Sequence, residues 1–122
     1  MIVALGVALA GGTGAVARFL CDRAIELRRA GPFPLGTLVV NVSGSLLLGL
    51  VTGTLWYHGG TPGWHEVAGA GFCGGFTTWS TAAWESVRLW SERLFGQAVL
   101  FTLGGLVLGL AAAAAGVALG AL

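Results

Sequence analysis

The stretch GFCGGFTTWST, residues 71–81, decides how this chain folds. It lies within an apolar segment that predicts a membrane-spanning helix, yet its glycines and threonines are poor residues for a helix interior. Glycine costs about 1 kcal/mol per helical position relative to alanine, and threonine loses side-chain freedom there. In lipid, backbone groups released by a broken helix must find other partners. The stretch therefore predicts a helix that is interrupted in the middle.

Two interpretations of this interruption follow from the residues. Backbone carbonyls freed by a broken helix are hard oxygen ligands, and discontinuous transporter helices use them to bind sodium. The segment GGFTT, residues 74–78, therefore predicts a cation site made of backbone. The alternative is a plain kink, whose freed groups bind threonine hydroxyls and neighbouring helices.

The composition predicts an integral membrane protein with a single domain, residues 1–122. The chain is 56% hydrophobic and 9% charged, whereas a soluble domain averages roughly 25% charged residues. No basic patch with interleaved aromatic residues is present, so we expect no nucleic-acid partner. Cys21 and Cys73 lack metal-ligand spacing and predict free thiols.

Four segments have the length and apolar character of a membrane span, which takes about 20 residues. They cover approximately residues 2–20, 35–57, 67–84 and 96–122. Pairs of glycines four residues apart form faces on which helix backbones approach closely. These pairs are Gly49/Gly53, Gly71/Gly75, Gly105/Gly109 and Gly116/Gly120. The sequence thus predicts an all-α membrane protein of four transmembrane helices, packed tightly as a bundle or oligomer and surrounded by lipid.

The arginines indicate the orientation of the spans. Four spans place both termini on one side of the membrane, and every arginine falls on the other side. The six are Arg18, Arg23, Arg28, Arg29, Arg88 and Arg93. By the positive-inside rule, the arginine-bearing loops are cytoplasmic and both termini are outside. We expect a multi-pass protein of the cell membrane that inserts in one orientation.

Polar residues recur within the second span. Thr37, Asn41 and Ser45 are spaced by four residues and share one helix face. The stripe is either hydrogen-bonding contact between helices or the lining of a solute path, since amides and hydroxyls offer donors to an anion. No carboxylate lies in the core of any span, which favours a passive pore over a proton-driven pump. Arg18, at the end of the first span, is interpreted as a structural residue that caps carbonyls and reaches the interface.

Three sequence blocks resemble those of the Fluc (CrcB) family of fluoride channels. They are GGTGAVARF at 11–19, GTLVVNVSGSLLLG at 36–49 and GFCGGFTTWSTAAWE at 71–85. Their order and spacing make the resemblance specific, and it covers nearly the whole chain. It implies a channel rather than an enzyme, through which fluoride leaves the cell passively and which protects the cell from fluoride toxicity.

The resemblance also implies an assembly and a set of site residues. Family members pair antiparallel, enclose two narrow fluoride paths, and bind a central sodium ion through carbonyls of both broken third helices. The sodium ligands would be the carbonyls of Gly74 and Thr77. The fluoride path would include Asn41 and Glu85. Further path residues would be Thr37, Ser45, Thr78, Trp79, Ser80 and Thr81.

Departures from the family pattern predict a specialised subunit. Two phenylalanines of the family pattern TTFSTF are replaced by Trp79 and Ala82, and a tyrosine and a serine of the fourth helix by Phe101 and Gly105. Together with the one-sided arginines, this favours a heterodimer with an oppositely oriented partner, and a homodimer stays open. The alternatives are a non-conducting assembly subunit, or a four-helix exporter of organic cations. That exporter needs an acidic residue in the first span, which residues 2–20 lack.

Overall fold

The chain folds as a bundle of helices, which a computed structural model describes for residues 1–122, apart from the side chain of Pro62. No strand occurs in this described part. The elements are α1 (Ile2–Glu26), α2 (Leu35–His58), α3 (Pro62–His65), η1 (Glu66–Cys73), α4 (Gly74–Phe76), α5 (Trp79–Ser91) and α6 (Phe95–Gly120).

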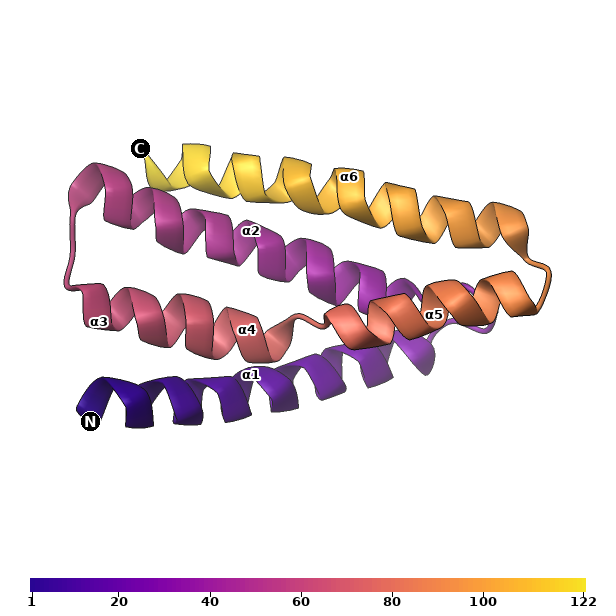
Figure 1. Cartoon of the computed structure of the whole chain (residues 1–122), viewed down its shortest axis with the longest axis horizontal. Helices are drawn as coiled ribbons and strands as arrows, with labels where there is room; N and C mark the ends of the chain where they lie inside the picture. Colours follow the sequence, from indigo (N-terminus) through magenta and orange to yellow (C-terminus); the bar gives the residue numbers. More distant parts are fainter.

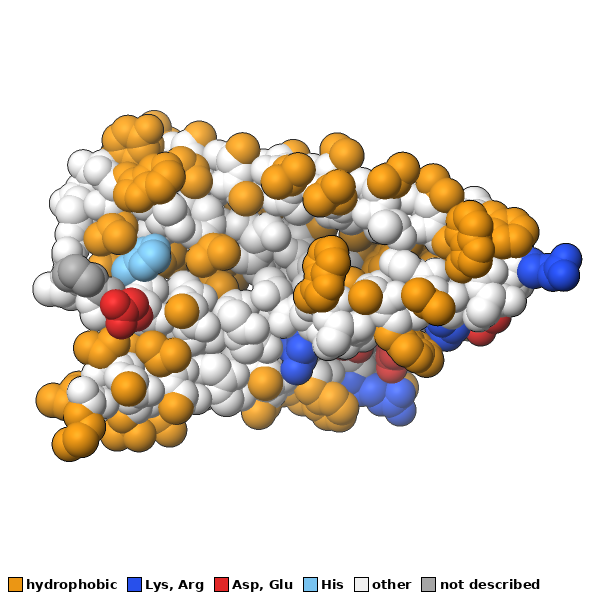
Figure 2. All heavy atoms as spheres, in the orientation of Figure 1, with side chains coloured by type: hydrophobic (Ala, Val, Ile, Leu, Met, Phe, Trp, Pro, Cys, Tyr) orange, Lys and Arg blue, Asp and Glu red, His pale blue; other side chains and the backbone are white. Residues whose placement is uncertain are grey.

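Three continuous helices, α1, α2 and α6, are long and apolar enough to cross a membrane. The shortest has 24 residues, or about 36 Å at 1.5 Å per residue, against a hydrocarbon core of about 30 Å. Apolar side chains are exposed along the helices, and in the face seen in Figure 2 the arginines lie over one half of the molecule. The prediction of an all-α, multi-pass membrane protein is confirmed.

The remaining helical run, from α3 to α5, is broken where the sequence predicts. Thr77 (φ −79°, ψ 162°) and Thr78 (φ −147°, ψ 119°) are extended, and α5 begins directly after them. Figure 1 shows α3, η1, α4 and α5 following one another along the bundle. The helical run extends beyond both ends of the predicted segment 67–84, to Pro62 and Ser91.

The first half of the broken run consists of α3, η1 and α4, and its longest part, η1, is a π-helix that the sequence did not predict. With α4, η1 lies against α1, with the backbones in direct contact. A Cβ on Gly14 of α1 would clash with the Phe72 carbonyl, and one on Gly75 would clash with the Gly11 carbonyl. Glycine at these positions therefore allows the close approach that holds this half of the run against α1.

The glycine faces of α2 and α6 pack against each other. A Cβ on Gly49 would clash with Ala113 of α6, and one on Gly116 would clash with the α2 backbone at Leu46. The pair formed by Gly105 and Gly109 is looser, because a Cβ at either position would make only ordinary contacts. The packing of α2 on α6 is thus concentrated in the half of the bundle near the C-terminus.

A small hydrophobic cluster closes the arginine-bearing end. Leu89, Ala98 and Phe101 are buried there, and Phe33 packs edge-on against Phe101 with ring centroids 5.9 Å apart. The cluster joins α5, α6 and the loop that precedes α2. It fixes the second half of the broken run against the rest of the bundle.

Replacing Gly49 by alanine should destabilise the protein by about 1–3 kcal/mol, because the added methyl group forces α2 and α6 apart. The midpoint of thermal unfolding in detergent measures this. Gly96→Ala is the matched control, since a Cβ there meets nothing within 4 Å. Equal midpoints for the two variants would contradict the backbone contact between α2 and α6.

Candidate functional site

Asn41 of α2 holds the break in the helical run. Its amide nitrogen donates to the Thr78 carbonyl at 2.9 Å, and its amide oxygen accepts from the Thr78 N–H at 2.8 Å. One side chain thus satisfies both backbone groups of a residue that lies outside the helix. Unpaired backbone groups at membrane depth cost several kcal/mol each, so this clamp makes the break tolerable. One amide hydrogen of Asn41 remains available for another acceptor.

Threonine side chains complete the two new helix ends. Thr78 is the N-cap of α5, and its hydroxyl oxygen accepts from the Thr81 N–H at 3.2 Å. The Thr78 hydroxyl in turn donates to the Thr81 hydroxyl at 3.0 Å. On the other side of the break, the N–H and the hydroxyl of Thr77 both donate to the Cys73 carbonyl at 2.9 Å. The α5 end is a capped N-terminus of the usual kind.

These hydrogen bonds leave the carbonyls of Gly74 and Thr77 without their helical partners. In a continuous helix, the Gly74 carbonyl would accept from the Thr78 N–H, and the Thr77 carbonyl from the Thr81 N–H. Both donors are bound elsewhere, by Asn41 and by the Thr78 hydroxyl. The residues predicted to bind sodium are therefore among those whose carbonyl oxygens lose a helical partner at the break, and sodium binding there stays a prediction.

Gly74 lies on the outer surface of this chain. The residue is exposed, and a Cβ placed on it would meet nothing within 4 Å. The backbone near the released oxygens is thus accessible to something outside the single chain. Uncharged carbonyl oxygens of this kind suit a hard monovalent cation such as sodium.

Two adjoining cavities lie between the break and the arginine-bearing end. The first, here called the mouth cavity, has a volume of about 120 Å³ and is bounded by the end of α1, residues 31–36 and α5. The second, the inner cavity, has a volume of about 150 Å³ and reaches Arg18 and Thr78. Asp22, Thr37 and Thr81 line both cavities. Together the cavities lead from the arginine-bearing end to the residue that Asn41 clamps.

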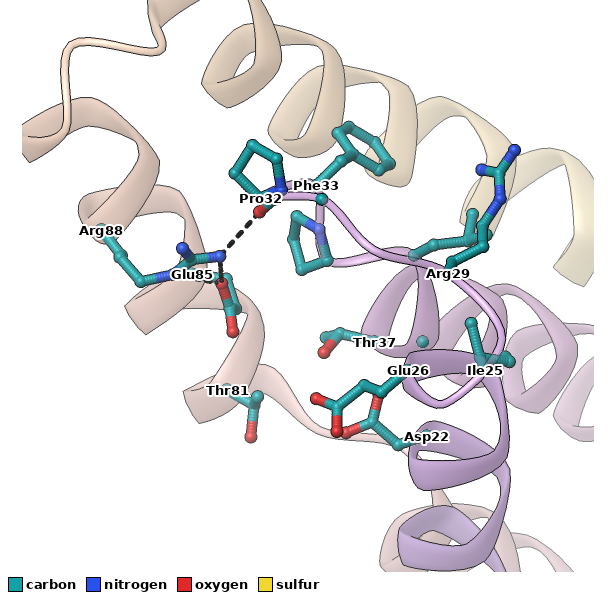
Figure 3. Close-up of a pocket in the computed structure, with 14 residues that line it drawn as sticks. Asp22, Ile25, Glu26, Arg29, Pro32, Phe33, Thr37, Thr81, Glu85 and Arg88 are labelled. Atoms are coloured by element: carbon teal, nitrogen blue, oxygen red, sulfur yellow. Dashed lines mark hydrogen bonds and ion pairs between the residues drawn. The ribbon is translucent and has the colours of Figure 1, made fainter.

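The walls of the mouth cavity are polar and held by ion pairs. Arg88 binds Glu85 at 2.6 Å and Glu92 at 3.3 Å, and it donates to the Pro32 carbonyl at 2.8 Å. Its hydrogen bond with Glu85 raises the pKa of Arg88 above its ordinary value. Figure 3 shows Glu85 and Arg88 on α5 across the cavity from Asp22 and Glu26 on α1. Arg88 therefore ties α5 to the loop that forms the opposite wall.

The three residues of the polar stripe of α2 face different parts of the protein. Thr37 is 4% exposed and lines both cavities, and Asn41 clamps the break. Ser45 faces α6, where its hydroxyl is 3.6 Å from a Cβ placed on Gly109. Four residues advance a helix by about 400°, so each step turns the stripe by about 40°. The structure brings Thr37 to the cavities and turns Ser45 away from them.

The other predicted site residues fall into two groups. Thr78, Thr81, Glu85 and Arg18 line one or both cavities. Trp79 and Ser80 are exposed, with 86% of Trp79 accessible, and line neither cavity. Among the positions that depart from the family pattern, Phe101 is buried in the hydrophobic cluster and Ala82 packs against it. This chain alone does not bring those residues into the passage.

The sequence analysis did not single out Asp22, which follows the predicted span 2–20. The residue lies within α1, four positions after Arg18, and lines both cavities. The spacing of four was the available signal, since it places Asp22 and Arg18 on one helix face. This spacing carries weight only if the helix continues past Arg18, and helix ends are hard to locate from hydropathy.

The fold and this site together define a small multi-pass membrane protein in which two adjoining cavities reach a clamped break in one helical run. Residues 5–117 match the family described as CrcB-like protein, Camphor Resistance (CrcB), and the chain belongs to that family.

Similar curated proteins agree with this assignment. The Fluoride-specific ion channel FluC 1 of Leifsonia xyli subsp. xyli is 48% identical over 121 residues, which cover 99% of this chain and 88% of the relative. FluC 2 of Cutibacterium acnes is 50% identical over 117 residues, covering 95% of each chain. FluC 2 of Mycolicibacterium paratuberculosis is 45% identical over 109 residues, covering 89% of this chain and 86% of the relative.

Asn41→Ala should lower the free energy of unfolding by about 2–4 kcal/mol, because it leaves both Thr78 backbone groups without partners. Thermal or denaturant unfolding in detergent measures this. Ser43→Ala is the control, since the Ser43 hydroxyl bonds only to carbonyls of its own helix, those of Val39 and Val40. A cost no larger than that of the control would show that Asn41 does not hold the break.

Proposed function

We propose that this chain is a subunit of a fluoride channel, through which fluoride leaves the cell down its electrochemical gradient. The observation that carries the proposal is the passage formed by the mouth and inner cavities, which ends at the clamped break. The names of its relatives supply the identity of the ion. The purpose would be protection from fluoride that enters as its neutral acid.

The passage offers what a small, strongly hydrated anion needs. A selective pore must replace the hydration shell with close donors. The hydroxyls of Thr37 and Thr81 face the cavities, and one amide hydrogen of Asn41 is free beyond the clamp. Arg18, at the inner cavity, adds positive charge. We assign fluoride binding to these residues, with Ser45, Thr78, Trp79, Ser80 and Glu85 as further path residues.

We propose that sodium binds at the break, through the carbonyls of Gly74 and Thr77. The released oxygens and the exposed backbone at Gly74 support this assignment. A bound cation would lower the electrostatic cost of an anion in a low-dielectric interior. Its coordination would be completed by a second subunit, because this chain offers its oxygens at the surface.

The partner is proposed to be a second subunit of the same family in antiparallel orientation. The exposed face around Gly74 and Trp79 is the surface it would cover. A heterodimer is favoured over a homodimer, since all arginines bias this chain towards one orientation, with its termini outside. Relatives numbered FluC 1 and FluC 2 are compatible with two different chains.

A second candidate function is that of a subunit that completes the channel without conducting through its own lining. The burial of Phe101 in a hydrophobic cluster, away from the cavities, favours it. In that case the partner's residues would line the working path. Both functions require the same assembly, and flux measurements separate them.

The flux experiment compares the chain alone, its partner alone and both together in liposomes, with a fluoride electrode as the readout. We expect robust flux only from the pair. Asn41→Asp in the pair should abolish flux, because it replaces the amide donor with a repelling carboxylate. Unchanged flux in this variant would remove Asn41 from the path and favour the non-conducting role. Strong flux from the chain alone would contradict the requirement for a partner.

Gly74→Leu tests the proposed contact between the two subunits. A side chain at this position meets nothing within the single chain, so the unassembled subunit should unfold at the same temperature as the wild type. Assembly and sodium-dependent stabilisation should be lost, because leucine would fill the space between subunits. Size-exclusion chromatography with multi-angle light scattering, with and without sodium, measures both. Normal assembly with normal sodium stabilisation would contradict the assigned cation site.

A further inference from the structure

Asp22 is the one acidic residue at the mouth whose charge no arginine neutralises directly. Glu26 pairs with Arg23 at 3.3 Å, and Arg88 binds both Glu85 and Glu92. No residue in the described structure forms an ion pair or a hydrogen bond with the Asp22 carboxylate. Its charge therefore acts on whatever enters the two cavities that it lines.

The position of Asp22 is fixed by the backbone of α2. A Cβ on Gly36 would clash with the Asp22 carboxylate, so glycine leaves the space that the carboxylate fills. Asp22 is half-buried and lies on the boundary shared by the mouth and inner cavities. Asp22 therefore lies, with Thr37 and Thr81, beside an anion that moves from one cavity to the other.

Thr37 brings a hydroxyl to the same boundary. The residue is 4% exposed and lines both cavities. Figure 3 shows the Thr37 hydroxyl directed into the mouth cavity, between Thr81 and Asp22. This hydroxyl offers a hydrogen-bond donor to an anion beside Asp22.

The charges around Asp22 set the consequence of its protonation. On α1 they are Arg18 and Glu26, on α5 Glu85 with its partner Arg88, and in the loop Arg29. The start of α2 brings no charged residue to this place. Glu26 and Glu85 add negative charge around Asp22, and Arg18, one helical turn before it, adds positive charge. Protonation of Asp22 removes one negative charge from this boundary.

We propose that Asp22 controls anion entry by its protonation: the ionised carboxylate opposes fluoride at the boundary of the two cavities, and the neutral carboxyl admits it. This inference rests on the proposed function. Neutral hydrogen fluoride releases a proton when it dissociates inside the cell. Acidification at this end would therefore increase conduction when fluoride accumulates there.

The test measures fluoride current across a planar bilayer that contains the assembled channel, as the mouth side is acidified from about pH 7.5 to about pH 4. This interval approaches the ordinary carboxyl pKa from above. Electroneutral hydrogen fluoride carries no current. Wild-type current should rise about threefold or more as the carboxylate is neutralised. Asp22→Asn should show the higher current already at the upper pH and little further rise.

Glu92→Gln is the control, because Glu92 lines neither cavity and its removal should leave the wild-type pH dependence in place. A wild-type current that does not change with pH, or an Asp22→Asn current no higher than wild type at the upper pH, would overturn the role of Asp22 alone. A wild-type current that does not change with pH overturns the proposal even if the variant does not assemble. The absence of any fluoride current from the assembled wild-type channel would instead overturn the proposed function itself.

Discussion

The two hydrogen bonds between Asn41 and the backbone of Thr78 are the interaction on which the site depends. They join residues 37 positions apart and satisfy both polar groups of a residue that has left its helix. Without them, the break would expose unpaired backbone in a region where water cannot replace the lost partners. The same bonds take the N–H that would otherwise bind the Gly74 carbonyl, so closing the clamp releases an oxygen on the other side of the break.

The rest of the bundle keeps this clamp in register. Glycine contacts between α1 and η1 hold the first half of the broken run, and the cluster at Leu89 and Phe101 holds the second half. Both halves must keep their positions relative to α2 for one amide to reach both groups of Thr78. Packing contacts throughout the bundle therefore hold Thr78 where the Asn41 side chain can bind it.

The break and the membrane fold were predictable because they depend on local composition. Segment 74–78 combines glycines and threonines that disfavour a helix, and the apolar spans are long and distinct. The sequence left two roles open for Asn41, a contact between helices and the lining of a solute path. The partner of Asn41 depends on how α2 packs against a segment distant in sequence. The rotation of the polar stripe along α2 follows from helix geometry. Predicting that Ser45 faces away from the cavities also requires the positions of the neighbouring helices. The π-helix has no sequence signal, and Asp22 was hidden by uncertainty about where α1 ends.

The most direct test of the account is a high-resolution map of the assembled protein in lipid, collected in sodium. We expect extended backbone at Thr77 and Thr78, both hydrogen bonds between Asn41 and Thr78, and a cation peak bound by the carbonyls of Gly74 and Thr77 from two antiparallel subunits. A continuous helix through residues 74–81, facing lipid, with no bound ion and with Asn41 directed elsewhere, would contradict it.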